Sequence, residues 1–186
     1  WYLPVALYFT ATLVSLVFID AEHMILPDVI NFPLLFVGLI ARIVLPAIGG
    51  AIYFQDLQHA PLIQMQCYPV WLVSLAGAGL GALVGGGFLW FIGWLWEKLR
   101  GIEAMGFGDV KMMFAVGVLL GWRLTFLTLF VGAFAGALIG VAIIIRDRDK
   151  DMQTQIPFGI YLGIGSFVSL LFGERLIEWY LQTFIP

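Results

Sequence analysis

Long, continuous apolar runs constrain this sequence more than any other feature. Six runs can be placed, at roughly residues 2–19, 29–54, 70–96, 112–122, 124–145 and 158–172. Their apolar residues are continuous rather than alternating, which is typical of membrane helices and not of barrel strands. Only 11% of the residues are charged, against about 25% in soluble domains. The sequence therefore predicts an all-α, polytopic membrane protein with about six transmembrane helices.

The fourth run, residues 112–122, is too short to cross a bilayer by itself. A helix of that length rises only about 16 Å, whereas the hydrocarbon core is about 30 Å thick. We expect this helix to extend into its flanks, to tilt among its neighbours or to cross only partly.

Basic residues indicate the orientation. Six of them fall in two loops that share one face if the chain crosses six times: Lys98, Arg100, Lys111, Arg146, Arg148 and Lys150. The opposite face has only Arg123 and Arg175, with Arg42 in or near the end of the second helix. The positive-inside rule assigns the first face, which also contains residues 20–28, to the cytoplasm.

Domain organisation follows from the same runs. We interpret residues 1–186 as one membrane-embedded domain, and expect an N-terminal part of the parent protein to precede Trp1, which already lies in an apolar run. Cys67 is the only cysteine, so these residues hold no internal disulfide. His23 and His59 fall on opposite faces, and we expect no metal and no cofactor. The lipid bilayer is the expected surrounding, and nucleic acid is not an expected partner because no large basic patch occurs.

Glycines recur every four residues along several of the runs. The series are Gly77, Gly81 and Gly85; Gly117 and Gly121; Gly132, Gly136 and Gly140; and Gly159 and Gly163. Small residues at this spacing allow helix backbones to approach closely in lipid. We favour static packing over a sliding interface.

Four acidic residues stand out from those with ordinary loop explanations. Asp109 follows Gly106 and Gly108 and comes just before the short fourth helix, so it fits either a helix N-cap or a reactive group. Asp20 ends the first run at a depth where a carboxylate loses hydration. For Asp28, which follows Pro27 and precedes the second helix, the N-cap hypothesis is favoured, and Glu22 is interfacial.

Topology pairs two of these acids. Two complete crossings separate Asp20 from Asp109, and an even number of crossings returns the chain to the same face. Two carboxylates brought together share a proton, because like charges at close range cannot both ionise cheaply. One can then take a proton from water while the other donates a hydrogen bond to a scissile carbonyl. The pair is suited to peptide hydrolysis without a covalent intermediate.

Three stretches resemble the type IV prepilin peptidases. They are "FIDAEHMILPD" (18–28), "GFGDVK" (106–111), which fits a Gly-x-Gly-Asp-x-Lys pattern, and "IPFGIYLGIG" (156–165). The resemblance implies an aspartic endopeptidase of the bacterial inner membrane that removes a basic leader from prepilins or pseudopilins at the cytoplasmic face. It also implies that Asp20 and Asp109 are the catalytic residues.

Supporting roles are expected for a second set of residues. Gly106 and Gly108 are interpreted as room for a substrate backbone, and Lys111 as a marker of membrane depth. Contacts to the basic leader are possible for Glu22, Asp28 and Glu103, although each also fits an interface or capping role.

The sequence departs from the family at two places. Ile160 stands where proline is usual, and residues 43–69 look like an insertion. The cysteine pairs associated with N-methylation in many family members are absent from these residues, so methyltransferase activity is not predicted for this chain alone. Alternative hypotheses are another Gly-x-Gly-Asp membrane protease, of the preflagellin or signal-peptide type, and a transporter with cation-binding acids.

Overall fold

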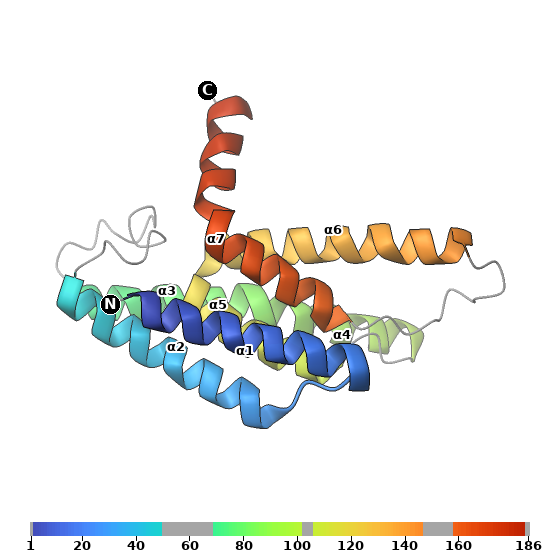
Figure 1. Cartoon of the computed structure of the whole chain (residues 1–186), viewed down its shortest axis with the longest axis horizontal. Coiled ribbons are helices and arrows are strands. Elements are labelled where there is room, and N and C mark those ends of the chain that lie inside the picture. Colours follow the sequence, from blue (N-terminus) through green and yellow to red (C-terminus); the bar gives the residue numbers. More distant parts are fainter. Residues whose placement is uncertain (1, 50–68, 102–105, 147–157, 185–186) are drawn as a thin grey trace.

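The computed structural model describes residues 2–49, 69–101, 106–146 and 158–184, and these ranges are almost entirely helical. Figure 1 shows them in chain order. The elements are α1 (Tyr2–His23), α2 (Asp28–Gly49), α3 (Val70–Ala82), η4 (Leu83–Gly87), α4 (Phe88–Arg100), α5 (Phe107–Leu120), α6 (Trp122–Arg146) and α7 (Phe158–Phe184). The insertion proposed at residues 43–69 lies mostly outside the described residues.

Among the described residues, five stretches are long and apolar enough to span a membrane. They are α1, α2, the continuous stretch Val70–Arg100, most of α6 (Trp122–Ala142) and α7. The sixth expected helix, α5, has 14 residues and rises about 21 Å. The predicted fold class, a polytopic helical membrane protein with one short helix, is confirmed.

Three predicted boundaries are wrong. The third helix does not end at 96 but continues to Arg100, and the last does not end at 172 but continues to Phe184. Charged residues do not end a helix when they line one face of it. The fourth helix begins at Phe107 and not at Met112, because Gly106 takes the N-cap position and the chain turns helical immediately after it.

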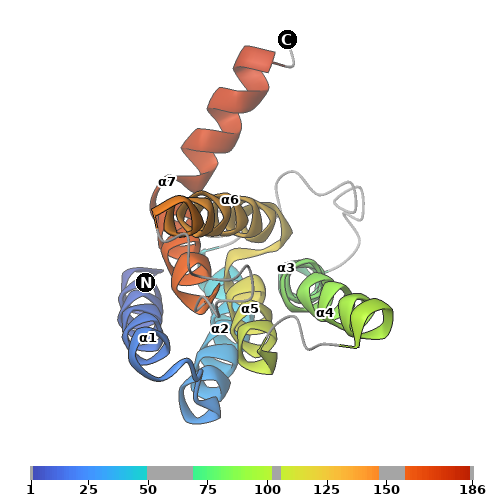
Figure 2. The same cartoon turned by 90° about the vertical axis from the view of Figure 1, so that its right-hand side faces the viewer.

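The short helix α5 lies in the middle of the bundle. In the end-on view of Figure 2 it is surrounded by α2, α3, α6 and α7, and it contacts each of them. Ten of its 14 residues are buried, including Met112 and Met113, which are fully covered. An apolar helix covered on all sides is held by its neighbours, so α5 does not need to span the bilayer.

Glycine contacts bring α5 close to the helices beside it. A Cβ added at Gly81 of α3 would collide with the backbone of Gly117 in α5, and the reverse also holds. In η4, a widened π-helical turn, a Cβ at Gly85 would lie 2.5 Å from the carbonyl oxygen of Met113. The close approach predicted from the glycine spacing is therefore present, and it leaves no space for side chains between these backbones.

Candidate active site

Asp20 lies near the end of α1 with its side chain turned into the bundle. Only 5% of the residue is exposed. Its carboxylate faces the backbone N–H groups of Ile160 and Gly159 in the first turn of α7. The Oδ2 atom nevertheless has no hydrogen-bond partner in the described part of the chain.

Asp109 lies in the first turn of α5 and is 7% exposed. The hypothesis that it caps this helix is wrong, because the N-cap is Gly106 and the helix begins at Phe107. Its backbone N–H donates to the carbonyl oxygen of Gly106 at 3.1 Å. The Oδ1 atom, like Oδ2 of Asp20, is buried without a hydrogen-bond partner among the described residues. Its side chain is therefore not used to complete the helix end.

The two carboxylates meet at Gly159, in the first turn of α7. A Cβ placed on Gly159 would lie 2.6 Å from Oδ2 of Asp20 and 3.0 Å from Oδ1 of Asp109. Since both distances start from one point, the two oxygens are at most about 5.6 Å apart, the sum of the two, which is within the reach of one bridging water. These are the same two oxygens that lack partners. The structure thus brings together the acids that counting crossings had paired.

Gly159 is a site residue that the sequence interpretation missed. The signal was present, because Gly159 belongs to the "IPFGIYLGIG" stretch that carried part of the family resemblance. Nothing in the sequence showed that this stretch would begin a helix beside both aspartates. The missing side chain keeps the space between the carboxylates open.

An ion pair joins two of the sequence motifs. The Nζ atom of Lys111 lies 2.8 Å from Oδ1 and 2.7 Å from Oδ2 of Asp28, and 5.3 Å from the centre of the Phe107 ring. Asp28 begins α2 and Lys111 belongs to the first turns of α5. This contact was not predicted: Asp28 had been interpreted as a cap and Lys111 as a depth marker. It connects the start of α2 to the helix that carries Asp109.

The two glycines of the Gly-x-Gly-Asp stretch have different surroundings. A Cβ at Gly108 would lie 2.8 Å from the Cβ of Leu26, so Gly108 allows the link between α1 and α2 to pack on α5. Gly106 is exposed, and a Cβ there would have only Oδ2 of Asp109 nearby, at 3.8 Å. The room predicted for a substrate backbone is therefore open at Gly106 and taken up by Leu26 at Gly108.

Two further residues, Glu22 and Glu103, were predicted as possible contacts to the leader. Glu22 is exposed at the end of α1, and Glu103 lies outside the described residues. Within the ranges that the structure covers, no three His, Cys, Asp or Glu side chains are grouped so that they could hold a metal ion.

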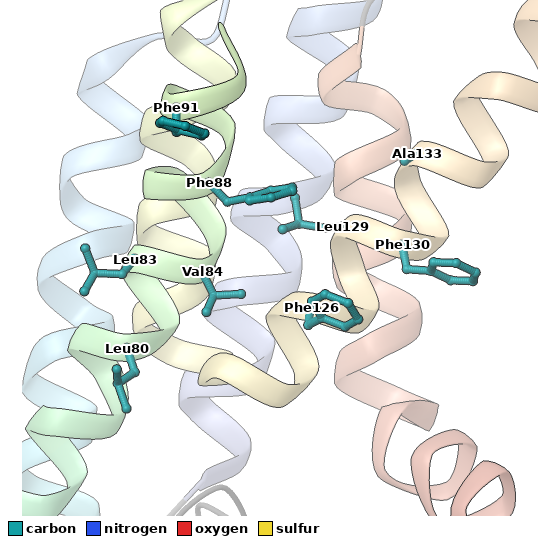
Figure 3. A pocket seen from close by; sticks show the side chains of 9 residues that line it. All are labelled: Leu80, Leu83, Val84, Phe88, Phe91, Phe126, Leu129, Phe130 and Ala133. Atoms are coloured by element: carbon teal, nitrogen blue, oxygen red, sulfur yellow. The ribbon is translucent and has the colours of Figure 1, made fainter. Parts of the chain in front are cut away.

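A separate apolar hollow lies between the α3–α4 stretch and α6. Figure 3 shows its lining, with Phe88 and Phe91 on one wall and Phe126 and Phe130 on the other. Its volume is about 660 Å³. None of the residues that line it can ionise or act as a nucleophile, so the hollow offers no group for acid–base chemistry.

These features define a class: a polytopic helical membrane protein with two buried, facing carboxylates, one of them in a Gly-x-Gly-Asp helix start. The sequence matches the type IV leader peptidase family over residues 7–141. The chain belongs to that family, and the resemblance seen in the motifs is confirmed. No solved structure matches the chain.

Curated relatives extend the similarity to the whole chain. It is 35% identical over 185 residues to a prepilin leader peptidase/N-methyltransferase of Aeromonas hydrophila, covering 100% of this chain and 55% of that protein. A protein of the same description from Pseudomonas aeruginosa is 35% identical over 182 residues, which cover 98% of this chain and 54% of the relative. The chain thus spans about half the length of the curated relatives it matches, and α7 with Gly159 falls inside this similarity.

Proposed function

We propose that this chain is the peptidase part of a prepilin leader peptidase, an aspartic endopeptidase that cleaves the leader from a prepilin or pseudopilin. The observation that carries the proposal is the pair of unpartnered oxygens on Asp20 and Asp109, held at most about 5.6 Å apart, which a single water can bridge. Family membership and the descriptions of the relatives support the substrate class. Methyl transfer, the second activity in those descriptions, is not assigned to these residues.

The chemistry begins with one proton shared by the two carboxyl groups. Two negative charges at this distance in a buried site are costly, so the pair holds a net charge near −1. Asp20 faces the backbone N–H groups of Gly159 and Ile160, which can donate to an ionised carboxylate, so we assign the shared proton to Asp109. Asp20 takes a proton from the bridging water, the water oxygen attacks the scissile carbonyl, and Asp109 donates a hydrogen bond to the carbonyl oxygen.

The second half of the reaction returns the two carboxyl groups to their starting state. The tetrahedral intermediate collapses, the C–N bond breaks, and the proton that Asp20 received passes to the departing amine. The products are a carboxylic acid on the leader and an amine on the mature protein, and the acid then gives its proton to the amine, so that they leave as a carboxylate and an ammonium group. Atoms balance with water as the only co-reactant, and the reaction needs no cofactor.

We further propose that the site faces the cytoplasm of a bacterial cell, with the chain in the inner membrane. The carboxylate pair lies where α1 ends and where α5 and α7 begin, at the end of the bundle that also contains Lys98, Arg100 and Lys111. Under the positive-inside rule this is the cytoplasmic end.

The test is cleavage of a co-expressed prepilin. Asp20→Asn and Asp109→Asn are each expected to lower the cleavage rate by about 10²–10⁴-fold, because general acid–base catalysis contributes that much. Both variants should remain in the membrane at the parent level. Glu97→Gln is the matched control, since Glu97 is an exposed acid at the same end of the bundle. Normal processing by either aspartate variant would overturn the proposal.

A further inference from the structure

The last part of α7 leaves the bundle. Gly173 is its last buried residue, and a Cβ there would lie 2.5 Å from Leu124 and 3.5 Å from Leu127, near the start of α6. None of residues 174–184, all of them described, is buried. In both Figure 1 and Figure 2 this part of α7 projects away from the other helices and runs crosswise to α1 and α6. We refer to residues 174–184 as the crosswise segment.

The crosswise segment has one polar and one apolar face. At 100° per residue, its charged and amide side chains fall within an arc of about 100°: Glu174, Arg175, Glu178 and Gln182. The opposite arc contains Leu176, Ile177, Trp179, Tyr180, Leu181 and Phe184, with Thr183 as its one polar member. A helix surrounded by lipid would not need the polar arc, and a helix in water would not expose the apolar one.

Three large aromatic side chains gather on the apolar face. Trp179, Tyr180 and Phe184 are 61%, 53% and 62% exposed. The ring of Phe184 lies 5.1 Å from that of Tyr180 and 6.3 Å from that of Trp179, centre to centre. This aromatic cluster is not covered by any part of the chain that the structure describes. Trp and Tyr favour the headgroup level of a bilayer, where an apolar ring and a polar N–H or O–H are both accommodated.

We propose that the crosswise segment lies in the membrane–water interface at the end of the bundle opposite the carboxylate pair, with its apolar face in lipid. The spanning helices run along the membrane normal, so a helix crosswise to them lies in the membrane plane. Since α7 begins beside the carboxylates and Gly173 packs against the start of α6, the segment is at the other end.

Charge identifies the kind of lipid contact. The polar arc contains two acids and one base, so attraction to anionic headgroups does not hold the segment. Burial of its apolar side chains is the driving force. The segment is continuous with the helix whose first turn contains Gly159, so it acts as a depth anchor for α7. This inference concerns membrane placement and does not depend on the proposed peptidase function.

Matched spin labels test this placement. In the full chain with Cys67→Ser, single cysteines are introduced by Tyr180→Cys on the apolar face and by Gln182→Cys on the polar face, two residues apart. The protein is reconstituted into phosphatidylcholine nanodiscs. We expect collisions with oxygen, which concentrates in lipid, to exceed those with a water-soluble nickel chelate several-fold at 180. The order should reverse at 182. Leu176→Cys and Glu178→Cys are a second pair that should repeat the contrast.

Four outcomes would overturn the proposal. Equal access of the nickel chelate to both labels would place the segment in water. Protection of both labels from the chelate, with high oxygen access, would place it within the hydrocarbon. Low access of both reagents at 180 together with spin–spin broadening would make a second copy of the chain the occupant of the apolar face. The fourth is a contrast that is absent in phosphatidylcholine alone and appears only when phosphatidylglycerol is added, which would show that attraction to anionic headgroups holds the segment.

Discussion

The two ends of α5 differ in whether the buried polar atoms there have hydrogen-bond partners. At its beginning, Oδ1 of Asp109 and the facing Oδ2 of Asp20 are buried without partners among the described residues. At its end, the fully buried Arg42 of α2 donates from Nε to the carbonyl oxygen of Val118 at 2.9 Å and from Nη2 to that of Leu119 at 3.0 Å. We call the beginning of α5, where buried oxygens lack partners within the described ranges, the incomplete end, and the end whose carbonyl groups accept from Arg42 the complete end.

This difference distinguishes polar groups that stabilise the fold from polar groups that are proposed to take part in the reaction. The last carbonyl groups of any helix lack partners within the helix, and a cation there also interacts favourably with the helix dipole. Arg42 satisfies two of these groups, so the end of α5 is held in place. The unpartnered carboxylate oxygens at the other end cost stability, and remain available to a water and a substrate. Unsatisfied groups belong where the reaction is proposed to occur.

Gly159→Ala is expected to have the largest effect on the incomplete end after the aspartate substitutions. The new methyl group would occupy the point 2.6 Å from Oδ2 of Asp20 and 3.0 Å from Oδ1 of Asp109, and would displace the bridging water and the carboxylates. A displacement of about 1 Å can cost about 100-fold in rate, and we expect a loss of at least that size in the prepilin cleavage assay.

Gly79→Ala is the control for that experiment. A Cβ at Gly79, in the interior of α3, meets nothing within 4 Å, and alanine is the better helix former. Its cleavage rate should equal that of the parent. If Gly159→Ala also cleaves at the parent rate, the space between the carboxylates is not needed for the reaction.

Arg42→Met should damage the complete end instead. Two buried carbonyl groups would lose donors, and an unsatisfied buried group costs about 1–3 kcal/mol. We expect the free energy of unfolding to fall by about 2 kcal/mol or more, measured by denaturant titration in mixed micelles. Arg42→Lys should recover only part of it, because lysine cannot place two donors in the same fixed geometry.

Substitutions at the two ends should also differ in the cleavage activity of those molecules that remain folded. Cleavage per folded molecule of Arg42→Met should stay within a few-fold of the parent, whereas the aspartate variants should be folded and inactive. Arg175→Met, which changes an exposed arginine, is the control for stability. Unchanged stability of Arg42→Met would show that the two ends of α5 do not differ in the way described.

How much of this could be read from the sequence differs between the two ends. That Asp20 and Asp109 lie at the same end of the bundle was predictable, because an even number of membrane crossings between two residues places them on the same face. Arg42 was only placed in or near the end of the second helix, because a basic residue in an apolar run does not indicate which carbonyl groups it will reach. Its partners are 76 and 77 residues away in the chain.

Gly159 was missed for a related physical reason. A glycine in a helix start can serve packing, capping or a site, and only the positions of α1 and α5 decide between these. The same holds for Gly108, whose contact with Leu26 became apparent only once the link between α1 and α2 was placed. Sequence patterns identified which stretches meet, and the structure identified the atoms between them.

Removing the Lys111–Asp28 ion pair is expected to have the smallest effect, although it lies at the same end as the carboxylates. The two side chains are 33% and 48% exposed, and ion pairs of this kind contribute less than about 1 kcal/mol because solvent and salt screen them. Asp28→Asn and Lys111→Met should each lower stability by no more than that, and the loss should shrink further in high salt. A double-mutant cycle measures the coupling between them. A coupling above about 2 kcal/mol would mean that the incomplete end of α5 is anchored as firmly as the complete one, and that its unpartnered carboxylates are held rigidly by α2.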